Sequence, residues 1–373
     1  MLATKARMSA YVNAIRSAVR PGDVVLDIGT GTGVMAMVAC QCGASRVYAL
    51  EPSDIIVVAR QAAKDNGFAD RIVFHRTLST SIDLPKRCDV LISDLRGSTP
   101  CYSTHLQDLR DARERLLKPD ARWICQADTL SVAVIDVPQR GSQLERTWDG
   151  SQWDLDLRSA LAFATNQISP YFCQPADLLG PGQSWARIDY PRLNSPHVRG
   201  TAQLAIKRSA SAHGLQIWFE AELFGGERFS NAPGAEDGVY ARMFLPWPEI
   251  LQLRAGDSVD VQIDAVQTGR DYTWTWKSTV HRAGNSQPVA VFHQSTLKGQ
   301  LLEPGIVARV AEDLPPVLTS AAEEIEFVLS RIDGNTRTAT LAAALRAEFP
   351  ERFPDDATAF ARVGQICATH TRA

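Results

Sequence analysis

The chain has 373 residues, a net charge of -3 and a composition that is 45% hydrophobic and 22% charged. This length predicts more than one folded core, since single domains usually hold about 100–200 residues. The acidic balance argues against a nucleic-acid partner, and no apolar run approaches the roughly 20 residues that span a bilayer. The sequence therefore predicts a multidomain globular protein that binds neither nucleic acid nor a membrane.

The N-terminal segment and the cysteines indicate a cytoplasmic location. Residues 1–23 form an amphipathic pattern without the continuous apolar core of a signal peptide. The seven cysteines are scattered, without the spacing of a disulfide framework or a zinc site. We therefore expect a protein of a reducing compartment with no bound metal.

A nucleoside site is predicted by the first strand and the glycine turn that follows it. The apolar segment 24–28 leads into Gly29, Gly31 and Gly33, and a helical segment comes next. Glycines let the backbone turn sharply there and approach a ligand without a Cβ in the way. The second predicted strand ends in Glu51, an acid placed to accept hydrogen bonds from ribose hydroxyls.

The glycine spacing distinguishes two ligands. A dinucleotide fingerprint reads G-x-G-x-x-G, whereas this turn reads G-T-G-T-G after Asp27. The pattern favours S-adenosyl-L-methionine and disfavours a nicotinamide enzyme. Further strands at 71–78 and 88–95 alternate with helices, which predicts a parallel, Rossmann-like α/β sheet over residues 1–130. Asp94 stands at the carboxyl end of the fourth strand, where open α/β sheets place their chemistry.

From residue 131 the chain changes to short segments in which apolar and polar residues alternate. They include residues 200–207, 214–224, 258–266 and 271–280. Period-two alternation with glycine and asparagine turns predicts an antiparallel β-barrel over residues 131–310. We expect the aromatic pair Trp274 and Trp276 in the core of this barrel, not on a base-stacking surface.

The last part of the chain, residues 311–373, predicts a small helical module. Thr319 or Ser320 is placed to cap its first helix. A second helix should begin at Thr338, and "FPDD" separates a third. The apolar face of the first helix should consist of Ile325, Val328, Leu329 and Ile332.

Five stretches of the chain resemble protein arginine methyltransferases. "VLDIGTGTGVMAMVACQCGASRVYALEPSD" and "CDVLISDLRG…LQDLRDARERLLKPDA" are similar to the cofactor domain of that family. "GLQIWFEAELFGGERFSNAP" and "VYARMFLPWPEILQLRAGDSVDVQID" are similar to its C-terminal barrel, and residues 152–182 are similar to its helical dimerisation arm. The resemblance implies a homodimeric, S-adenosylmethionine-dependent N-methyltransferase whose acceptor is a peptide, a protein or an amino-acid-like small molecule.

The resemblance also implies the cofactor contacts. Arg7, in the pattern M-L-x-x-x-x-R-x-x-x-Y, would bind the cofactor's carboxylate, Glu51 the ribose, and the segment 77–81 the adenine. The candidate cofactor-binding residues are Arg7, Asp27, Gly29, Thr30, Gly31, Gly33, Glu51, Pro52, Leu78 and Ser79.

The reaction centre departs from the family pattern. Members carry two glutamates that grip a guanidinium, and Asp94 and Ser103 stand at these positions here. Arg96 adds a positive charge that would repel a guanidinium, and we expect it to meet a substrate carboxylate. The family's Thr-His-Trp triplet reads Gly-Val-Tyr at 238–240. Asp94, Arg96 and Ser103 are therefore candidate catalytic residues for altered acceptor chemistry, and a catalytically silent cofactor- or peptide-binding scaffold is the alternative.

Another resemblance concerns the C-terminal module. "IEFVLSRIDGNTRTATLAAALRAEF" is similar to the helical half of PqqD-like domains, in which a peptide adds as a strand beside a small sheet. Only "GIVARVAED", residues 305–313, could supply strand to such a sheet here. A helical cap on the barrel is the alternative.

Overall fold

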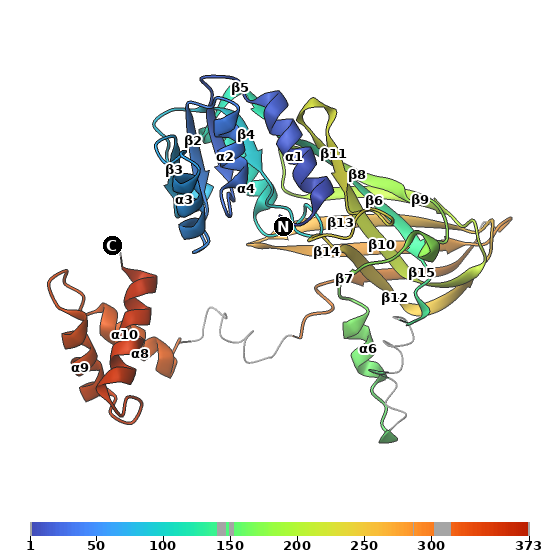
Figure 1. The fold of residues 1–373 in the computed structure, drawn as a ribbon. Helices are drawn as coiled ribbons and strands as arrows, with labels where there is room; N and C mark the ends of the chain where they lie inside the picture. Colours follow the sequence, from blue (N-terminus) through green and yellow to red (C-terminus); the bar gives the residue numbers. More distant parts are fainter. Residues whose placement is uncertain (1, 140–146, 149–152, 286, 302–314, 372–373) are drawn as a thin grey trace. The chain divides into compact units, whose positions relative to one another are not determined.

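The computed structural model describes residues 2–139, 147–148, 153–285, 287–301 and 315–371. The chain forms two compact units, Met1–Leu301 and Leu302–Ala373. The first unit combines an α/β part with an antiparallel β part, and the second unit is helical (Figure 1). The expected fold class is confirmed, and the two predicted N-terminal domains share one compact unit.

A parallel sheet in the order β3-β2-β1-β4-β5 forms the α/β part. Its strands are β1 (Val24–Ile28), β2 (Arg46–Leu50), β3 (Ile72–His75), β4 (Cys88–Ser93) and β5 (Leu117–Trp123), and its helices are α1 (Lys5–Ala18), α2 (Val34–Gln41), α3 (Ile56–Asp65) and α4 (His105–Arg115), with a short 3-10 turn, η1 (Ser79–Ser81). The central strand β1 pairs with β2 on one side and β4 on the other. The strand order reverses between β1 and β4, and ligands bind at such a switch point.

Continuous apolar runs explain why the central strands are buried. Val25 and Leu26 on β1 and Leu91 and Ile92 on β4 are at most 2% exposed. Strands of parallel sheets read as unbroken apolar runs because helices cover both of their faces. The polar residues at the ends of these strands are therefore left to form the site.

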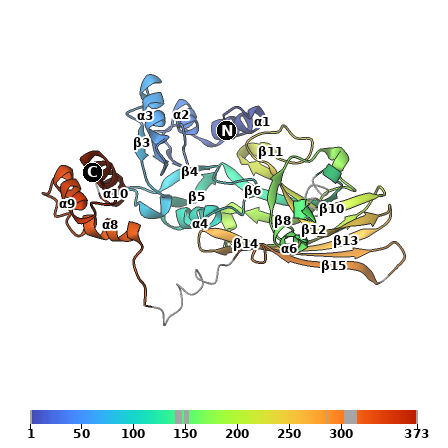
Figure 2. The same ribbon diagram turned by 90° about the horizontal axis from the view of Figure 1, so that it is seen from below.

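Two antiparallel sheets form the β part, which lies beside the α/β part in this unit (Figure 2). One has the order β7-β12-β10-β6-β8, with β11 paired to β10, and the other has the order β15-β14-β13-β9. Their strands are β6 (Cys125–Ile135), β7 (Ser169–Tyr171), β8 (Gln183–Asp189), β9 (Val198–Ala205), β10 (Ala210–Leu223), β11 (Arg228–Ser230), β12 (Arg242–Leu253), β13 (Ser258–Thr268), β14 (Asp271–His281) and β15 (Pro288–Ser295). Trp274 and Trp276 are buried as expected, and the indole of Trp276 donates a hydrogen bond to Gln294.

The second unit contains α8 (Ser320–Leu329), α9 (Thr338–Glu348) and α10 (Asp356–His370) around their own apolar core. Thr319 caps α8 by accepting a hydrogen bond from the backbone of Ala322, and α9 begins at Thr338 as predicted. Val328 is fully buried, whereas Leu329 is 37% exposed and does not belong to the core. The proposed strand at 305–313 lies outside the described residues.

The longest helices of the described ranges, α1 and α10, have 14 and 15 residues. None of the described helices has the length and apolar character needed to cross a membrane. The same ranges contain no group of three or more His, Cys, Asp and Glu side chains that could hold a metal ion. All seven cysteines are free thiols.

Candidate functional site

A cavity of about 480 Å³ opens at the carboxyl ends of β1, β2 and β4. Volumes of roughly 300–1,000 Å³ are typical of small-molecule sites. The cavity brings together seven residues that the sequence singled out: Arg7, Asp27, Gly29, Thr30, Gly31, Glu51 and Asp94. A glycine turn, an acid and a buried charge cluster therefore face the same space.

The three glycines of the turn have different functions. Gly29 has φ +74°, and a Cβ on it would lie 2.4 Å from Cδ2 of Leu95. Gly31 has φ +54°, and a Cβ on it would have no neighbour within 4 Å, so its backbone borders open space. Gly33 has φ +79° and caps α2, with Ala59 packed against it, and it does not line the cavity. Of these three glycines, only Gly31 both lines the cavity and has open space where a side chain would project.

Glu51 lies directly against the glycine turn. Its Oε2 accepts a hydrogen bond from the backbone N–H of Gly31 at 3.1 Å. Its Oε1 accepts hydrogen bonds from the backbone and the hydroxyl of Ser53, at 3.0 and 2.7 Å. These contacts hold the carboxylate at the tip of β2, the position from which we predicted that it binds a ribose.

Asp27 lies deeper, at the base of the glycine turn. It is 2% exposed and accepts a 2.6 Å hydrogen bond from the hydroxyl of Thr30. Burial raises the pKa of Asp27 to about 7, although the hydrogen bond from Thr30 opposes the shift. The side chain therefore exchanges a proton near neutral pH, unlike an exposed aspartate.

Asp94 follows directly after β4 and is held by two arginines. The Nε–H of Arg7 donates to Oδ2 of Asp94 at 2.5 Å, and Nη2 of Arg7 forms an ion pair with the same oxygen. The Nη1–H of Arg96 donates to Oδ1 of Asp94 at 2.8 Å. All three side chains are at most 5% exposed, so water does not screen these contacts.

Arg96 lies in the core and does not line the cavity. Besides Asp94, it donates to Oδ2 of Asp128 at 3.0 Å and to the hydroxyl of Tyr11 at 2.9 Å. Burial acts to lower the pKa of Arg96, but Asp128 and the other groups around it raise that pKa well above its ordinary value. The structure corrects our expectation that Arg96 meets a substrate carboxylate, because carboxylates of the chain itself already bind it.

Other candidate residues do not line the cavity. Ser103 is half-buried in a left-handed backbone conformation with φ 47°. Pro52 and Leu78 are exposed beside the site. Ser79 is buried, and its carbonyl accepts a hydrogen bond from Arg115. The functions given to these residues remain predictions.

Comparisons with known proteins agree on the class. Residues 7–125 match the family model "Ribosomal protein L11 methyltransferase (PrmA)". The chain is 34% identical over 233 residues to "Probable protein arginine N-methyltransferase 6" of Arabidopsis thaliana, a match that covers 60% of this chain and only 54% of the relative. It is 26% identical over 270 residues to "Arginine N(omega)-methyltransferase" of Streptomyces achromogenes subsp. streptozoticus, covering 70% and 74% of the two chains.

A solved structure shows the same fold. The "PRMT1 enzyme-prozyme heterotetrameric complex with AdoHcy" of Trypanosoma brucei superposes with a TM-score of 0.72 at 21% identity, over 79% of this chain and 95% of that one. The chain has the fold of arginine methyltransferases, and its residues 7–125 match a methyltransferase family model. These comparisons give no support to the resemblance of its C-terminal module to PqqD-like domains, and they do not favour a catalytically silent scaffold.

The cavity is also lined by residues that the sequence analysis did not single out. They are Met8, Thr32, Val34, Met35, Ile55 and Leu95, with Leu2 at the mouth. Most of them directly follow a predicted residue, as Met8 follows Arg7 and Leu95 follows Asp94. The sequence could thus have indicated these positions only through their neighbours in the chain. Whether each side chain faces the cavity depends on the fold.

The segment 236–240 of the β part packs against the start of α1 and against Arg7. Glu236 accepts hydrogen bonds from the backbone N–H groups of Lys5 and Ala6 at the start of α1. Tyr240 is buried, and the guanidinium of Arg7 lies 6.0 Å from the centre of its ring. A tyrosine therefore packs against the charge cluster where the family motif has other residues.

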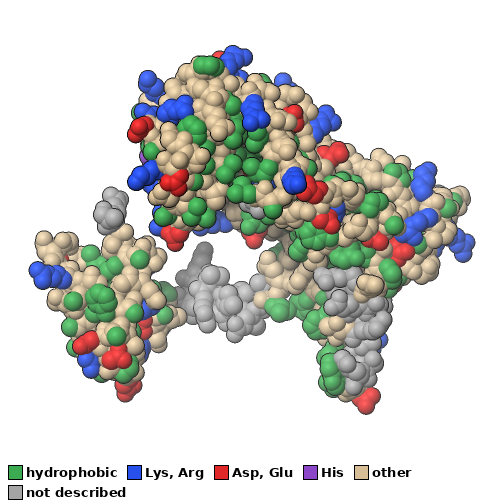
Figure 3. Space-filling view, viewed as in Figure 1, with side chains coloured by type: hydrophobic (Ala, Val, Ile, Leu, Met, Phe, Trp, Pro, Cys, Tyr) green, Lys and Arg blue, Asp and Glu red, His purple; other side chains and the backbone are tan. Residues whose placement is uncertain are grey.

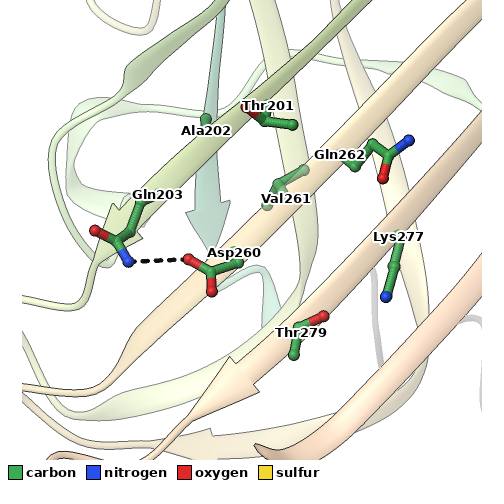
Figure 4. Close-up of a pocket in the computed structure, with 8 residues that line it drawn as sticks. All are labelled: Thr201, Ala202, Gln203, Asp260, Val261, Gln262, Lys277 and Thr279. Carbon is green, nitrogen blue, oxygen red and sulfur yellow. Dashed lines mark hydrogen bonds between the residues drawn. The ribbon is translucent and has the colours of Figure 1, made fainter.

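A second hollow lies far from this chemistry, on the outer face of the sheet of β9, β13 and β14 (Figure 4). Thr201, Gln203, Asp260, Gln262, Lys277 and Thr279 point from neighbouring strands into it. Gln203 donates a hydrogen bond to Asp260 at 3.0 Å. These side chains belong to the polar, solvated face of an antiparallel sheet, and we assign no site there.

Proposed function

We propose that this methyltransferase binds S-adenosylmethionine in the cavity and methylates a nitrogen of a peptide, a protein or an amino-acid-like molecule. The observation that carries the proposal is the open backbone of Gly31 facing Glu51 at the switch point of the sheet. The relatives are named as arginine methyltransferases, and the Trypanosoma neighbour is titled as a complex with AdoHcy. Both names support the cofactor and the reaction class.

The residues of the cavity suit this cofactor. Glu51 is placed to bind the ribose hydroxyls, and Gly31 leaves room for the amino-acid end of the ligand beside the turn. Arg7 supplies a cation at the opposite wall, next to Asp94. Met8, Met35 and other apolar side chains line the rest. When bound, S-adenosylmethionine would supply an electrophilic methyl group.

Asp94 is the residue of this chain best placed to orient the acceptor. Its carboxylate lines the cavity at the end of β4, and it can accept an N–H of the incoming nitrogen. The nitrogen lone pair then forms the new bond to the methyl carbon while the carbon–sulfur bond breaks and its electrons stay on sulfur. The proton released by the nitrogen passes to Asp94 or to solvent. Positioning contributes most to such an in-line displacement.

We also propose that the protein is a homodimer formed through its helical arm. The arm helix α6 (Arg158–Ala164) extends away from the sheets and has no buried residue (Figure 1). Trp153 and Phe163 on the arm are 60% and 39% exposed, and Val57 and Val58 on α3 are 65% and 50% exposed. Hydrophobic side chains are visible on the described part of the arm (Figure 3). Apolar patches of this kind mark protein interfaces.

Light scattering on the intact protein tests the dimer. Wild type should have the mass of two chains, and the double variant W153S/F163S should have the mass of one. A monomeric wild type at micromolar concentration would contradict the proposal. The free thiols of all seven cysteines support a cytoplasmic location for this assembly.

The reaction itself is tested with a labelled methyl donor. Wild type incubated with a cell extract should transfer the label to peptides or small molecules that mass spectrometry then identifies. Asp94→Asn should lose at least 100-fold in rate, because the proton-accepting carboxylate is gone. Asp54→Asn, an exposed acid near the same cavity, should retain full rate. Equal rates for Asp94→Asn and wild type would remove Asp94 from the mechanism.

A further inference from the structure

A buried guanidinium, that of Arg96, lies directly behind Asp94 on the acceptor side of the site. Its Nε and Nη1 atoms contact Asp128 and Asp94, and Phe219 and Phe229 lie at 5.4 and 5.2 Å from its centre. Its side chain is 1% exposed. A guanidinium held by two carboxylates and stacked on aromatic rings is how proteins bind an arginine side chain.

Few acceptor positions of Asp94 remain for a substrate. A carboxylate offers about four lone-pair positions. Arg7 uses two contacts on Oδ2, and Arg96 uses one on Oδ1. The remaining position faces the hydroxyl of the buried Tyr240, and a single incoming N–H suffices to fill it. A substrate guanidinium binds a carboxylate through two parallel N–H groups, and these need two adjacent positions.

The other acids near the cavity do not supply that second position. Glu51 lies at the tip of β2 against the glycine turn, and the proposed function assigns it to the ribose of the cofactor. Asp27 is buried under the glycine turn with a raised pKa. Asp128 is fully buried beyond Arg96 and accepts a hydrogen bond from the hydroxyl of Tyr190. An incoming guanidinium would thus stay unpaired next to two buried arginines, which is costly.

We infer that Arg96 excludes guanidinium acceptors, so that the chain methylates an amide or amine nitrogen that presents a single N–H to Asp94. The inference rests on the proposed function and specifies its substrate class. Arg96 acts as a specificity-determining residue from behind the cavity, because it occupies Oδ1 of Asp94 and keeps a positive charge beside that carboxylate. The relatives named for arginine would then differ from this chain in their acceptor.

A binding experiment tests whether Arg96 fills a guanidinium site. Arg96→Ala leaves Asp94 and Asp128 without this partner and opens a hole of guanidinium size. Millimolar methylguanidinium should raise its melting temperature at least twice as much as methylammonium at equal ionic strength, whereas wild type should respond equally to both. The double variant R96A/D128N should lose the preference. An equal response of Arg96→Ala to both cations would overturn the inference.

A transfer experiment on wild type needs no variant to fold. The enzyme is given the labelled donor and two peptides, one with arginine as its sole side-chain nitrogen and one with asparagine, glutamine and lysine but no arginine. We expect label in the second peptide and less than 1% of that amount on the arginine side chain of the first. Label on arginine by wild type overturns the inference while the proposed function stands. Failure to bind S-adenosylhomocysteine overturns the proposed function instead.

Discussion

Replacing Asp27 by asparagine should change how the stability of the protein depends on pH. Burial raises the pKa of Asp27 from 3.8 to about 7. The folded state therefore holds a proton on Asp27 that the unfolded chain releases between about pH 4 and pH 7. Because the folded pKa is the higher one, this group stabilises the protein at low pH, and its contribution is lost as the pH rises to 7.

The size of the effect follows from the shift. About three pKa units at 1.36 kcal/mol each give on the order of 4 kcal/mol. Asparagine resembles the protonated carboxyl and can still accept the hydrogen bond from Thr30. Relative to wild type, the free energy of unfolding of Asp27→Asn should thus rise by up to about 4 kcal/mol between pH 4 and pH 7 and stay level above pH 7.

Urea denaturation of both proteins from pH 4 to pH 8.5 measures this difference. Asp89→Asn is the matched control, because the pKa of Asp89 is shifted in the opposite direction. Burial acts to raise this pKa, but the contacts of Asp89 with Lys118 and the backbone of Val24 lower it below its ordinary value. That variant should be less stable than wild type above pH 4, with the loss disappearing in acid. A difference between Asp27→Asn and wild type that does not vary with pH would refute the reasoning.

Three further predictions concern the turn and the charge cluster. Gly29→Ala should destabilise the fold by about 1–3 kcal/mol, because its Cβ would lie 2.4 Å from Leu95. Gly31→Ala should cost about 1 kcal/mol of stability and mainly weaken the binding of S-adenosylhomocysteine. Equal effects of the two variants on binding would contradict this prediction. Tyr11→Phe should lower the free energy of unfolding, measured by urea denaturation, by about 1–3 kcal/mol, because the hydroxyl of Tyr11 hydrogen-bonds to Ser93 and Arg96. A decrease below about 0.5 kcal/mol would show that these hydrogen bonds do not stabilise the fold. His105 should stay neutral from pH 5 to pH 8, because burial and Arg96 lower its pKa to about 3, and an NMR titration with a midpoint near 6.5 would disprove this.

Local sequence was enough to predict the first strand, the glycine turn and the acid that border the cavity. The apolar run before Gly29 becomes β1, and Glu51 lies at the tip of β2, because both features depend on periodicity and turn chemistry within short segments. The capping residue Thr319 and the helix start at Thr338 were predictable for the same reason.

The acceptor half was not predictable in this way. The direction of Arg96 depends on Asp128, 32 residues later on β6, and on Tyr190 beyond β8. No local sequence pattern indicates that β6 brings the buried carboxylate of Asp128 next to the loop after β4. Leu329 shows a similar limit, because helical periodicity alone could not tell that it faces away from the core.

Calorimetric titration with S-adenosylhomocysteine tests directly whether the cavity beside Gly31 and Glu51 binds the cofactor. We expect one site per chain and at least tenfold weaker binding to Glu51→Ala than to wild type. Binding to Asp54→Ala should be unchanged, because the exposed carboxylate of Asp54 pairs with Arg76. Absence of binding at saturating ligand, or equal affinity of Glu51→Ala and wild type, would contradict it.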